Sequence, residues 1–413
     1  MTSAAVAVPE TWQVTTVADL VNPGSRSIAI GPFGSRMKAD LYVSGGVPVV
    51  RGNNITNSRT PTGNFVYVSE EVANSMPGCL LYPGDLVFPH RGAIGEVGLI
   101  GDSVAPPLML STSLMKLTPD RRRVDSLFLY YYFHSEPGRR ELLMRASTVG
   151  TPGIGQPLAS LRSITVPLPP LGEQRAIAAT LGALDDKIES NRRAQITGEQ
   201  LTRAIVERAL ASAWSAPATS LGGYCSLVKS VVAADHIDGD ANYIGFEHMP
   251  RGSIFLNEWS TADGLGSHKS QFETGDVLFG RLRPYFKKVG VAPIGGVCST
   301  DILVLRPRTP NLTALVAIVA SSDPLIDALS AGATGTRMPR ASWADLAKWP
   351  VPRLTEDETA ELGRVTRALL EQLTRLTFES QKLAALQDAL VPELLSGRIR
   401  LPEAANAVAE ATA

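Results

Sequence analysis

The sequence has little cysteine and almost no net charge. Its 413 residues include three cysteines, Cys79, Cys225 and Cys298, none of which belongs to a CxxC pair or has a histidine at ligand spacing. A disulfide framework or a zinc site is therefore not expected. Lys and Arg total 39 against 40 Asp and Glu, a formal net charge of −1. A stand-alone DNA-binding protein usually carries a basic excess. Either DNA is not the ligand, or the basic residues are local and a partner supplies the rest of the positive charge.

Long apolar runs are also missing. The strongest, Leu312–Ala320, is far shorter than the roughly 18 residues that a transmembrane helix needs. The opening residues MTSAAVAVPE lack a charged region followed by a long apolar run, so a signal peptide is not expected. Hydrophobic residues nevertheless make up 44% of the chain, enough for two or three domains with apolar cores. We expect a globular protein located in the cytoplasm.

Familiar catalytic motifs do not occur in the sequence. It has no Gly-x-x-x-x-Gly-Lys-Ser/Thr loop, no Gly-x-Ser-x-Gly elbow and no His-Glu-x-x-His pattern, and its five histidines are scattered. Asp185 and Asp186 are adjacent, but consecutive helical residues point about 100° apart. That geometry favours helix or partner contacts over a metal site. We predict no catalytic, cofactor-binding or metal-binding residues.

What the sequence does contain is an internal repeat. The segments YPGDLVF (82–88) and ETGDVLF (273–279) both place a Gly-Asp turn before an apolar strand. In both halves the same succession follows: a basic stretch, two further strands, a helix-like stretch, a Gly/Thr/Pro-rich loop and a Pro-punctuated extended connector. The helix-like stretches are Ser126–Ser135 and Leu312–Ser321, and the connectors are 164–170 and 349–352. Proline excludes helix from the connectors, so the repeat predicts two domains of one plan.

A long helix is expected after each connector. The first runs from about Glu173 to Ala211 and the second from about Glu356 to Leu395, where Thr355 and Glu358 form a capping box. Gly397 suits a C-terminal stop, although Pro392 could kink or end the helix earlier. The first apolar stripe comprises Ile177, Leu181, Leu184, Ile188, Leu201 and Ile205, and the second comprises Leu362, Val365, Leu369, Leu376, Leu383, Leu386 and Leu390.

Each stripe could pack on its own domain, but two equivalent helices favour burial against each other as an antiparallel coiled coil. The polar positions Asn191 and Gln195 in one helix, and Gln372 and Glu379 in the other, would then set the register. The predicted fold class is α+β, with two mixed globular domains, two long helices and a pseudo-two-fold repeat. The predicted boundaries are 1–170 and 216–353 for the domains, 171–215 and 354–400 for the helices, and 401–413 for the tail.

Six segments resemble, in order, the specificity subunit of type I restriction–modification systems. They are GPFGSRMK (31–38), GVPVVRGNNI (46–55), PGDLVF (83–88), PLPPLGEQRAI (167–177), LDDKI (184–188) and LSGRI (395–399). The segment YIGFEHM (243–249) is similar to the opening of target-recognition domains in that family. The second half lacks the GPFGS run and its residues 229–240 are acidic, which limits residue-level transfer there.

The resemblance implies a DNA-reading subunit without chemistry of its own. Each domain would read half of a bipartite double-stranded DNA target, and the helices would set the spacing. The helices would also dock two modification subunits, which bind S-adenosylmethionine and methylate adenine. Two restriction subunits, which use ATP and Mg, are further partners where the system cleaves DNA. The Asn/Asp-Pro-Pro-Tyr motif of the modification subunits does not occur in this chain.

Candidate DNA contacts follow from donor chemistry. Arg reads guanine, Asn reads adenine, and Lys, Arg or backbone amides bind phosphate. In the first domain the candidates are Arg36, Lys38, Arg51, Asn53, Asn54, His90 and Arg91, with Gly34 and Ser35 as further donors. In the second they are Arg281, Arg283, Tyr285, Lys287, Lys288, Arg337 and Arg340. The triplet Arg121–Arg123 is interpreted instead as a solvated charge run.

Two other functions stay open at this point. The chain could be a bilobed scaffold that binds protein partners rather than DNA, with the long helices as its docking surface. It could also be a DNA-modifying enzyme with an unrecognised motif. Steep salt dependence of binding would distinguish DNA binding from a scaffold, and activity of the chain alone with S-adenosylmethionine would indicate an enzyme.

Overall fold

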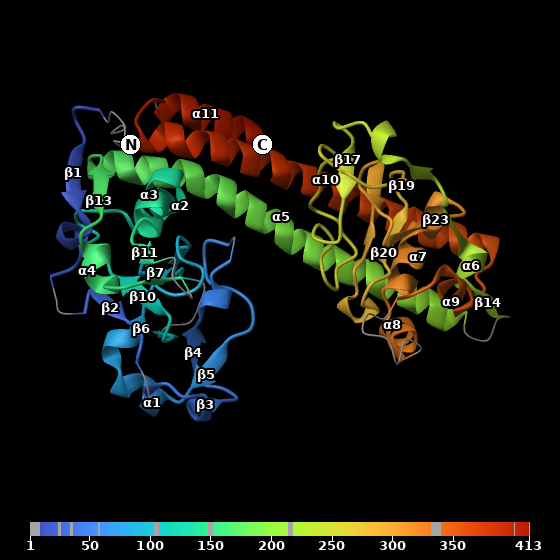
Figure 1. Ribbon diagram of the computed structural model, residues 1–413, viewed down its shortest axis with the longest axis horizontal. Coiled ribbons are helices and arrows are strands. Elements are labelled where there is room, and N and C mark those ends of the chain that lie inside the picture. Colours follow the sequence, from blue (N-terminus) through green and yellow to red (C-terminus); the bar gives the residue numbers. More distant parts are fainter. Residues whose placement is uncertain are drawn as a thin grey trace. The chain divides into compact units, whose positions relative to one another are not determined.

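The computed structural model describes residues 9–23, 26–33, 36–56, 58–102, 107–147, 152–213, 218–331, 340–399 and 401–412. Contacts divide the chain into two compact units, which are described separately. Unit 1 comprises residues 1–189 and 381–413, and unit 2 comprises residues 190–380 (Figure 1). Both units mix helices and sheets, so the predicted α+β class is confirmed.

Unit 1 contains two main sheets. The four-stranded sheet has the order β2-β10-β7-β8, and the five-stranded sheet has the order β3-β5-β4-β9-β6 with β4 and β9 parallel. The strands of the first sheet are β2 (Ile28–Ile30), β7 (Leu86–Pro89), β8 (Gly98–Leu99) and β10 (Leu114–Leu117). Those of the second are β3 (Tyr42–Val43), β4 (Val47–Val50), β5 (Val66–Val68), β6 (Leu80–Leu81) and β9 (Leu108–Leu110).

Unit 2 repeats this plan. Its four-stranded sheet has the order β15-β23-β20-β21, and its five-stranded sheet has the order β16-β19-β22-β17-β18 with β17 and β22 parallel. The strands are β15 (Cys225–Leu227), β20 (Val277–Gly280), β21 (Val289–Val291) and β23 (Ile302–Pro307), then β16 (Val231–Val232), β17 (Asn242–Ile244), β18 (Ser260–Thr261), β19 (Lys269–Phe272) and β22 (Gly296–Ser299). The four-stranded sheets match strand for strand. In the five-stranded sheets β5-β4-β9-β6 corresponds to β18-β17-β22-β19, and the fifth strand, β3 or β16, lies at opposite edges. The shared strand orders and directions confirm the internal repeat.

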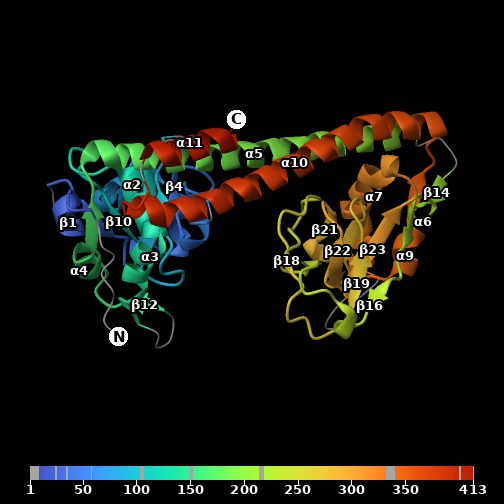
Figure 2. The same cartoon turned by 90° about the horizontal axis from the view of Figure 1, so that it is seen from above.

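Each unit packs a short apolar helix against its four-stranded sheet. In unit 1 this is α2 (Ser126–His134), whose N-cap Asp125 accepts bonds from two backbone amides and whose Phe133 meets Phe88 of β7 with ring centroids 4.9 Å apart. In unit 2 it is α7 (Thr313–Ala320), buried at every position and set against β20 and β21 (Figure 2). Both lie where helix-like stretches are predicted. Helices α3 (Glu136–Leu143) and α8 (Asp323–Ala331) follow them.

The proline-rich connectors are extended, as predicted. β13 (Thr165–Leu168) pairs with β1 (Gln13–Thr16), and β24 (Pro350–Pro352) pairs with β14 (Ala218–Ser220). The remaining short elements are α1 (Glu70–Ser75), α4 (Pro157–Arg162), α6 (Leu221–Tyr224), α9 (Trp343–Ala347), β11 (Ala146–Ser147) and β12 (Gly153–Ile154).

Two long helices, α5 (Leu171–Ser212) and α10 (Glu356–Leu395), pack together in both units. In unit 1 the first part of α5 meets the last part of α10, and Gln387 donates a 2.7 Å hydrogen bond to Asp185. In unit 2 Asn191 donates to Glu379 at 2.9 Å and Gln195 donates to Thr377 at 2.7 Å. Residue numbers rise on one helix as they fall on the other, so the pairing is antiparallel, as predicted.

The predicted apolar stripes are wrong at one position on each helix of the α5–α10 interface, here called the seam. Gln372 is exposed and Leu373 is buried, while Leu201 is 48% exposed and Thr202 is fully buried. A Cβ at Gly198 would lie 2.6 Å from the Leu373 side chain, and the Thr202 hydroxyl donates to the Gly198 carbonyl at 2.8 Å. Thr202 can therefore enter the seam without an unsatisfied hydroxyl, a local solution that an apolar heptad does not predict.

The C-terminal end of the chain adds one more helix to unit 1. α10 continues through Pro392, and Gly397, with φ of +71°, follows its end. The predicted tail forms α11 (Leu401–Thr412), whose Ala404 and Val408 enter the same core as the end of α10. Of the helices in the described ranges, none taken singly is long and apolar enough to cross a membrane; only the bent pair Pro310–Ala320 and Asp323–Ala331 passes that test jointly.

Candidate nucleic-acid interface

A Gly-Asp turn precedes one of the two central strands of each four-stranded sheet, β7 in unit 1 and β20 in unit 2. In unit 1 the Gly84 amide donates to the Ile100 carbonyl at 2.8 Å, and in unit 2 the Gly275 amide donates to the Ala292 carbonyl at 2.9 Å. The φ angles of the two glycines are +91° and +87°, a region that strains any other residue. These turns start β7 and β20 in the same register.

The other ends of β7 and β20 bring the predicted basic stretches to equivalent places. The His90 amide donates to Ser113 at 2.9 Å, and the Arg281 amide donates to Asp301 at 3.0 Å. The carbonyls of His90 and Arg281 accept bonds from Ile154 and Ala341, respectively. Each basic stretch therefore borders the end of a Gly/Thr-rich loop. The central parts of those loops, with candidate Arg337, lie outside the described residues.

His90 and Arg91 have different exposures. His90 is 2% exposed, and its Nε2 lies 3.1 Å from the Thr112 carbonyl. Burial lowers the pKa of His90 below its ordinary value, so the ring is held in its neutral form. Arg91 is exposed. The geometry makes His90 a support for the strand end and leaves Arg91 as the residue that can reach a ligand.

The loop after β4 carries three candidates. Asn54 is 1% exposed; its Nδ2 donates to the carbonyls of Thr62 and Asn64, and its Oδ1 accepts from the Arg51 amide at 3.0 Å. Both amide atoms are thus used inside the loop, so Asn54 shapes the loop instead of presenting a free edge to a base. Asn53 is exposed, and Arg51 is half-buried with one guanidinium bond to Asn64.

Arg36 and Lys38 flank a buried anchor. Both side chains are exposed, whereas Met37 between them is 7% exposed and belongs to the core of the five-stranded sheet. Alternation of this kind points the two cations away from the core. The neighbouring Gly34 and Ser35 lie outside the described residues.

In unit 2 two members of the predicted cluster from Arg281 to Lys288 have partners within the unit. Lys287 forms an ion pair with Asp323, and Lys288 donates to the Phe246 carbonyl. Burial lowers the pKa of Lys288. Arg283 and Tyr285 are exposed, so these two residues present the most accessible cation and aromatic ring of the segment.

Two residues of this segment have an unusual backbone conformation. Among the described residues other than glycine, Arg283 and Lys287 have positive φ, +50° and +49°. Such conformations cost free energy and cluster at functional sites. Arg251, which the sequence reasoning did not single out, stacks 4.1 Å above the Phe286 ring and adds a cation beside the segment. No spacing rule would have connected Arg251 with Phe286, because they come together only through folding.

Two further candidates of unit 2, Arg281 and Arg340, are only partly available to a ligand. Arg340 forms a 2.9 Å ion pair with Asp301 and keeps 54% of its side chain exposed. Arg281 is half-buried, and its Nε is buried without a hydrogen-bond partner among the described atoms. Both residues lie at the loop-bearing end of β20, which keeps them beside Arg283.

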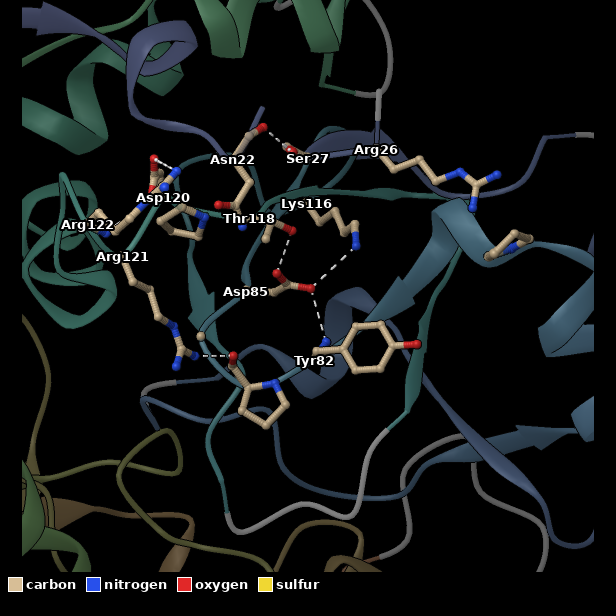
Figure 3. Close-up of a pocket in the computed structure, with 14 residues that line it drawn as sticks. Asn22, Arg26, Ser27, Tyr82, Asp85, Lys116, Thr118, Asp120, Arg121 and Arg122 are labelled. Atoms are coloured by element: carbon tan, nitrogen blue, oxygen red, sulfur yellow. Dashed lines mark hydrogen bonds and ion pairs between the residues drawn. The ribbon is translucent and has the colours of Figure 1, made fainter. Parts of the chain in front are cut away.

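A cavity of about 890 Å³ opens at the other end of β7, beside the Gly-Asp turn of unit 1 (Figure 3). Lys116 lies 3.4 Å from Asp85, Arg122 lies 3.0 Å from Asp120, and the Arg121 guanidinium donates to the Pro83 carbonyl. Two of the four cations that line this cavity are paired with its two carboxylates, whereas Arg26 and Arg121 have no carboxylate partner within it. The sequence-predicted candidates lie instead at the Arg91 end of the strand. Arg121–Arg123 are exposed, in keeping with a solvated run.

Comparison with known proteins agrees with this layout. Residues 9–198 match the model of the type I restriction modification DNA specificity domain. The chain is similar to that family over 190 of its 413 residues. This confirms the resemblance, and Arg36 through Arg91 and most of α5 lie inside the matched segment.

Two curated relatives are specificity subunits from Methanocaldococcus jannaschii. The chain is 27% identical over 201 residues to the type I restriction enzyme MjaVIII specificity subunit and 29% identical over 203 residues to the putative MjaX specificity subunit. Each match covers 48% of this chain and less than half of the relative, 44% and 41% respectively.

A solved structure extends the likeness to the whole chain. The crystal structure of the type I restriction–modification S subunit from M. genitalium superposes with a TM-score of 0.61 and covers 95% of this chain and 98% of its own, at 14% sequence identity. At that identity the superposition establishes the fold alone. The likeness in fold thus extends beyond the segment of residues 9–198 that the family model matches.

Proposed function

We propose that this chain is the DNA specificity subunit of a type I restriction–modification complex. Each unit would read one half of a bipartite double-stranded DNA target, and α5 and α10 would set the spacing. One observation carries the proposal: two units of the same topology place accessible cations at the same end of the same strand, Arg91 after β7 and Arg283 after β20. Two equivalent DNA-contacting domains suit a target with two half-sites.

Partners supply what the chain lacks. Two modification subunits would bind S-adenosylmethionine and methylate adenine, and restriction subunits using ATP and Mg would join in systems that also cleave. The chain itself would hold no cofactor and perform no catalysis. Its net charge of −1 fits a subunit whose partners provide much of the phosphate contact. A role on chromosomal DNA implies the cytoplasm.

A scaffold that binds only proteins is the second candidate. Ile196 and Leu201 of α5, each 48% exposed, favour a protein partner on the long helix. They fit equally well with docking of modification subunits, so the presence or absence of DNA contacts separates the two functions.

The direct test is the adenine-methylation map of DNA from cells that express this chain with its modification subunit. One bipartite motif is expected, and exchange of either globular domain should alter one half-site only. Arg91→Ala and Arg283→Ala should each weaken binding of the assembled complex about tenfold, as loss of one base contact does, with affinity falling steeply as salt rises. A stable complex that yields no motif would support the scaffold.

A further inference from the structure

Two equivalent loops join the globular domains to one long helix. Loop 51–65, described at residues 51–56 and 58–65, follows β4 in unit 1, and loop 245–259 follows β17 in unit 2. β4 and β17 are the equivalent parallel strands of the two five-stranded sheets. Their sequences differ, starting RGNNI in one and GFEHM in the other. Both loops nevertheless contact a carboxylate side chain of α5, Asp186 in unit 1 and Glu199 in unit 2.

In unit 1 the link is an arginine of the loop. Arg59 Nη2 lies 2.7 Å from Asp186 Oδ1, and Nη1 lies 3.9 Å from Asp185 Oδ2. The Arg59 carbonyl accepts a 2.9 Å bond from the Leu99 amide of β8. Asp185 is held in turn by Tyr131 and Gln387. The loop is therefore fixed between the sheet and the helix, with Arg51 and Asn53 at its start.

In unit 2 the helix provides the acceptor for loop backbone. Glu199 Oε1 accepts from the Ile254 amide at 3.1 Å, and its Oε2 accepts from the Ser253 hydroxyl at 2.7 Å. The Glu199 side chain is only 14% exposed. Further along the loop, Trp259 packs edge-on against Phe378 of α10, with ring centroids 5.8 Å apart.

Loop 245–259 also supports the basic segment of unit 2. The Phe246 carbonyl accepts from Lys288, the Gly252 amide donates to the Lys287 carbonyl at 3.2 Å, and Arg251 stacks on Phe286. Displacement of this loop would remove the supports of Phe286, Lys287 and Lys288, the residues that directly follow Arg283 and Tyr285. Glu199 is thus connected to the candidate DNA contacts through one layer of residues.

We propose that Asp186 and Glu199 are positioning residues, through which α5 holds the reading loop of each unit in place. The inference rests on the proposed function. Its distinctive consequence is that two carboxylates on one helix control different half-sites, because each contacts the loop of a single unit.

The test uses the full complex and the methylation map. Glu199→Gln replaces one acceptor oxygen with a donor, so methylation fidelity at the half-site read by unit 2 should fall at least tenfold, as for a lost hydrogen bond to a charged group. Asp186→Asn should lower fidelity at the other half-site by up to about fivefold, because its ion pair is largely exposed. Relaxation of both half-sites, or of neither, would overturn the proposal.

Matched variants separate positioning from general damage. Glu207→Gln removes the same charge from an exposed position of α5 in unit 2 and should leave both half-sites unchanged. The charge swap Arg59→Asp with Asp186→Arg should restore the half-site of unit 1. Amide exchange in the purified chain gives a readout independent of methylation: Glu199→Gln should speed exchange in residues 245–259 about tenfold and leave residues 51–65 unchanged. Unchanged exchange would refute the positioning role, whereas a missing motif with the expected exchange would refute only the proposed function.

Discussion

Asp85 and Asp276 hold the same turn with different partners. Asp85 accepts from Thr118 at 2.6 Å and lies 3.4 Å from Lys116, a lysine buried in the core. Asp276 instead forms two 2.8 Å bonds to Arg306, whose side chain is 38% exposed. Strand register makes Thr118 equivalent to Arg306, and Lys116 equivalent to the apolar Val304.

The difference shows which part of the repeat is essential. Gly, Asp and the backbone bonds are common to both units, while the cation that neutralises the carboxylate comes from the core in one unit and from the surface in the other. A buried carboxylate needs hydrogen bonds and a counter-charge, but it does not prescribe their source. The two domains can therefore diverge in sequence while keeping one frame.

The largest expected effect comes from removing the carboxylate charge. Asp85→Asn leaves Lys116 charged and buried, which should lower the free energy of unfolding of unit 1 by about 3 to 5 kcal/mol. Asp276→Asn leaves Arg306 able to turn to water, so unit 2 should lose only about 1 to 2 kcal/mol. Hydrogen exchange in β7 and β20 measures both losses within the full chain.

A double variant tests the cause. Lys116→Met combined with Asp85→Asn removes both charges and should recover most of the loss in unit 1. Equal losses for the two single variants, or no recovery in the double variant, would show that the source of the counter-charge is unimportant.

The starts of the two long helices give a smaller contrast. Gln174 of α5 is 1% exposed and bonds to the Asp125 amide and to the carbonyls of Arg123 and Pro169. Gln174→Ala should lower the opening free energy of the first turn of α5 by about 2 kcal/mol, since buried backbone groups lose their partners. Thr355→Ala removes the local cap of α10, in which the Glu358 amide donates to the Thr355 hydroxyl at 3.2 Å, and should cost about 1 kcal/mol. Amide exchange in the two first turns checks the order, and a larger loss at Thr355 would reverse the interpretation.

The smallest contrast depends on pH. His90 and Arg281 occupy equivalent positions, but only His90 is an imidazole, a group whose ordinary pKa is about 6.5. Because burial lowers the pKa of His90 in the folded state, its contribution is constant above pH of about 6.5, the ordinary value. As pH falls below that value, the unfolded chain binds the proton first, and stability declines until the lowered folded pKa is reached.

The decline should not exceed about 1.4 kcal/mol per pH unit. Urea titrations from pH 7 to 5 in wild type and His90→Gln measure it, and exchange in β7 against β20 localises it. A pH dependence of equal size in the His90→Gln variant would assign the effect to other groups.

Local patterns predicted much of this protein. The repeated Gly-Asp turns, the extended proline connectors, the Thr355–Glu358 capping box and both long helices were readable because each depends on residues close together in the chain. Asp185 and Asp186 were interpreted as contact residues, and both make such contacts, Asp185 with Tyr131 and Gln387 and Asp186 with Arg59. For the nucleic-acid interface, residue type nominated Arg91 and Arg283, whose accessibility the structure then established.

Other features depended on contacts between distant segments. Asn54 and His90 have suitable chemistry for DNA, yet folding buries both and directs their polar atoms to backbone groups. Thr202 and Leu373 lie in the seam, in place of the predicted residues, because Gly198 allows the two helices to approach there. Arg251 stacks on Phe286 although the two residues are far apart in the chain. Helix caps, turns and periodicity are short-range interactions that neighbouring residues specify. Burial and hydrogen-bond partnership depend on which surfaces meet, and that is established only when the whole chain has packed.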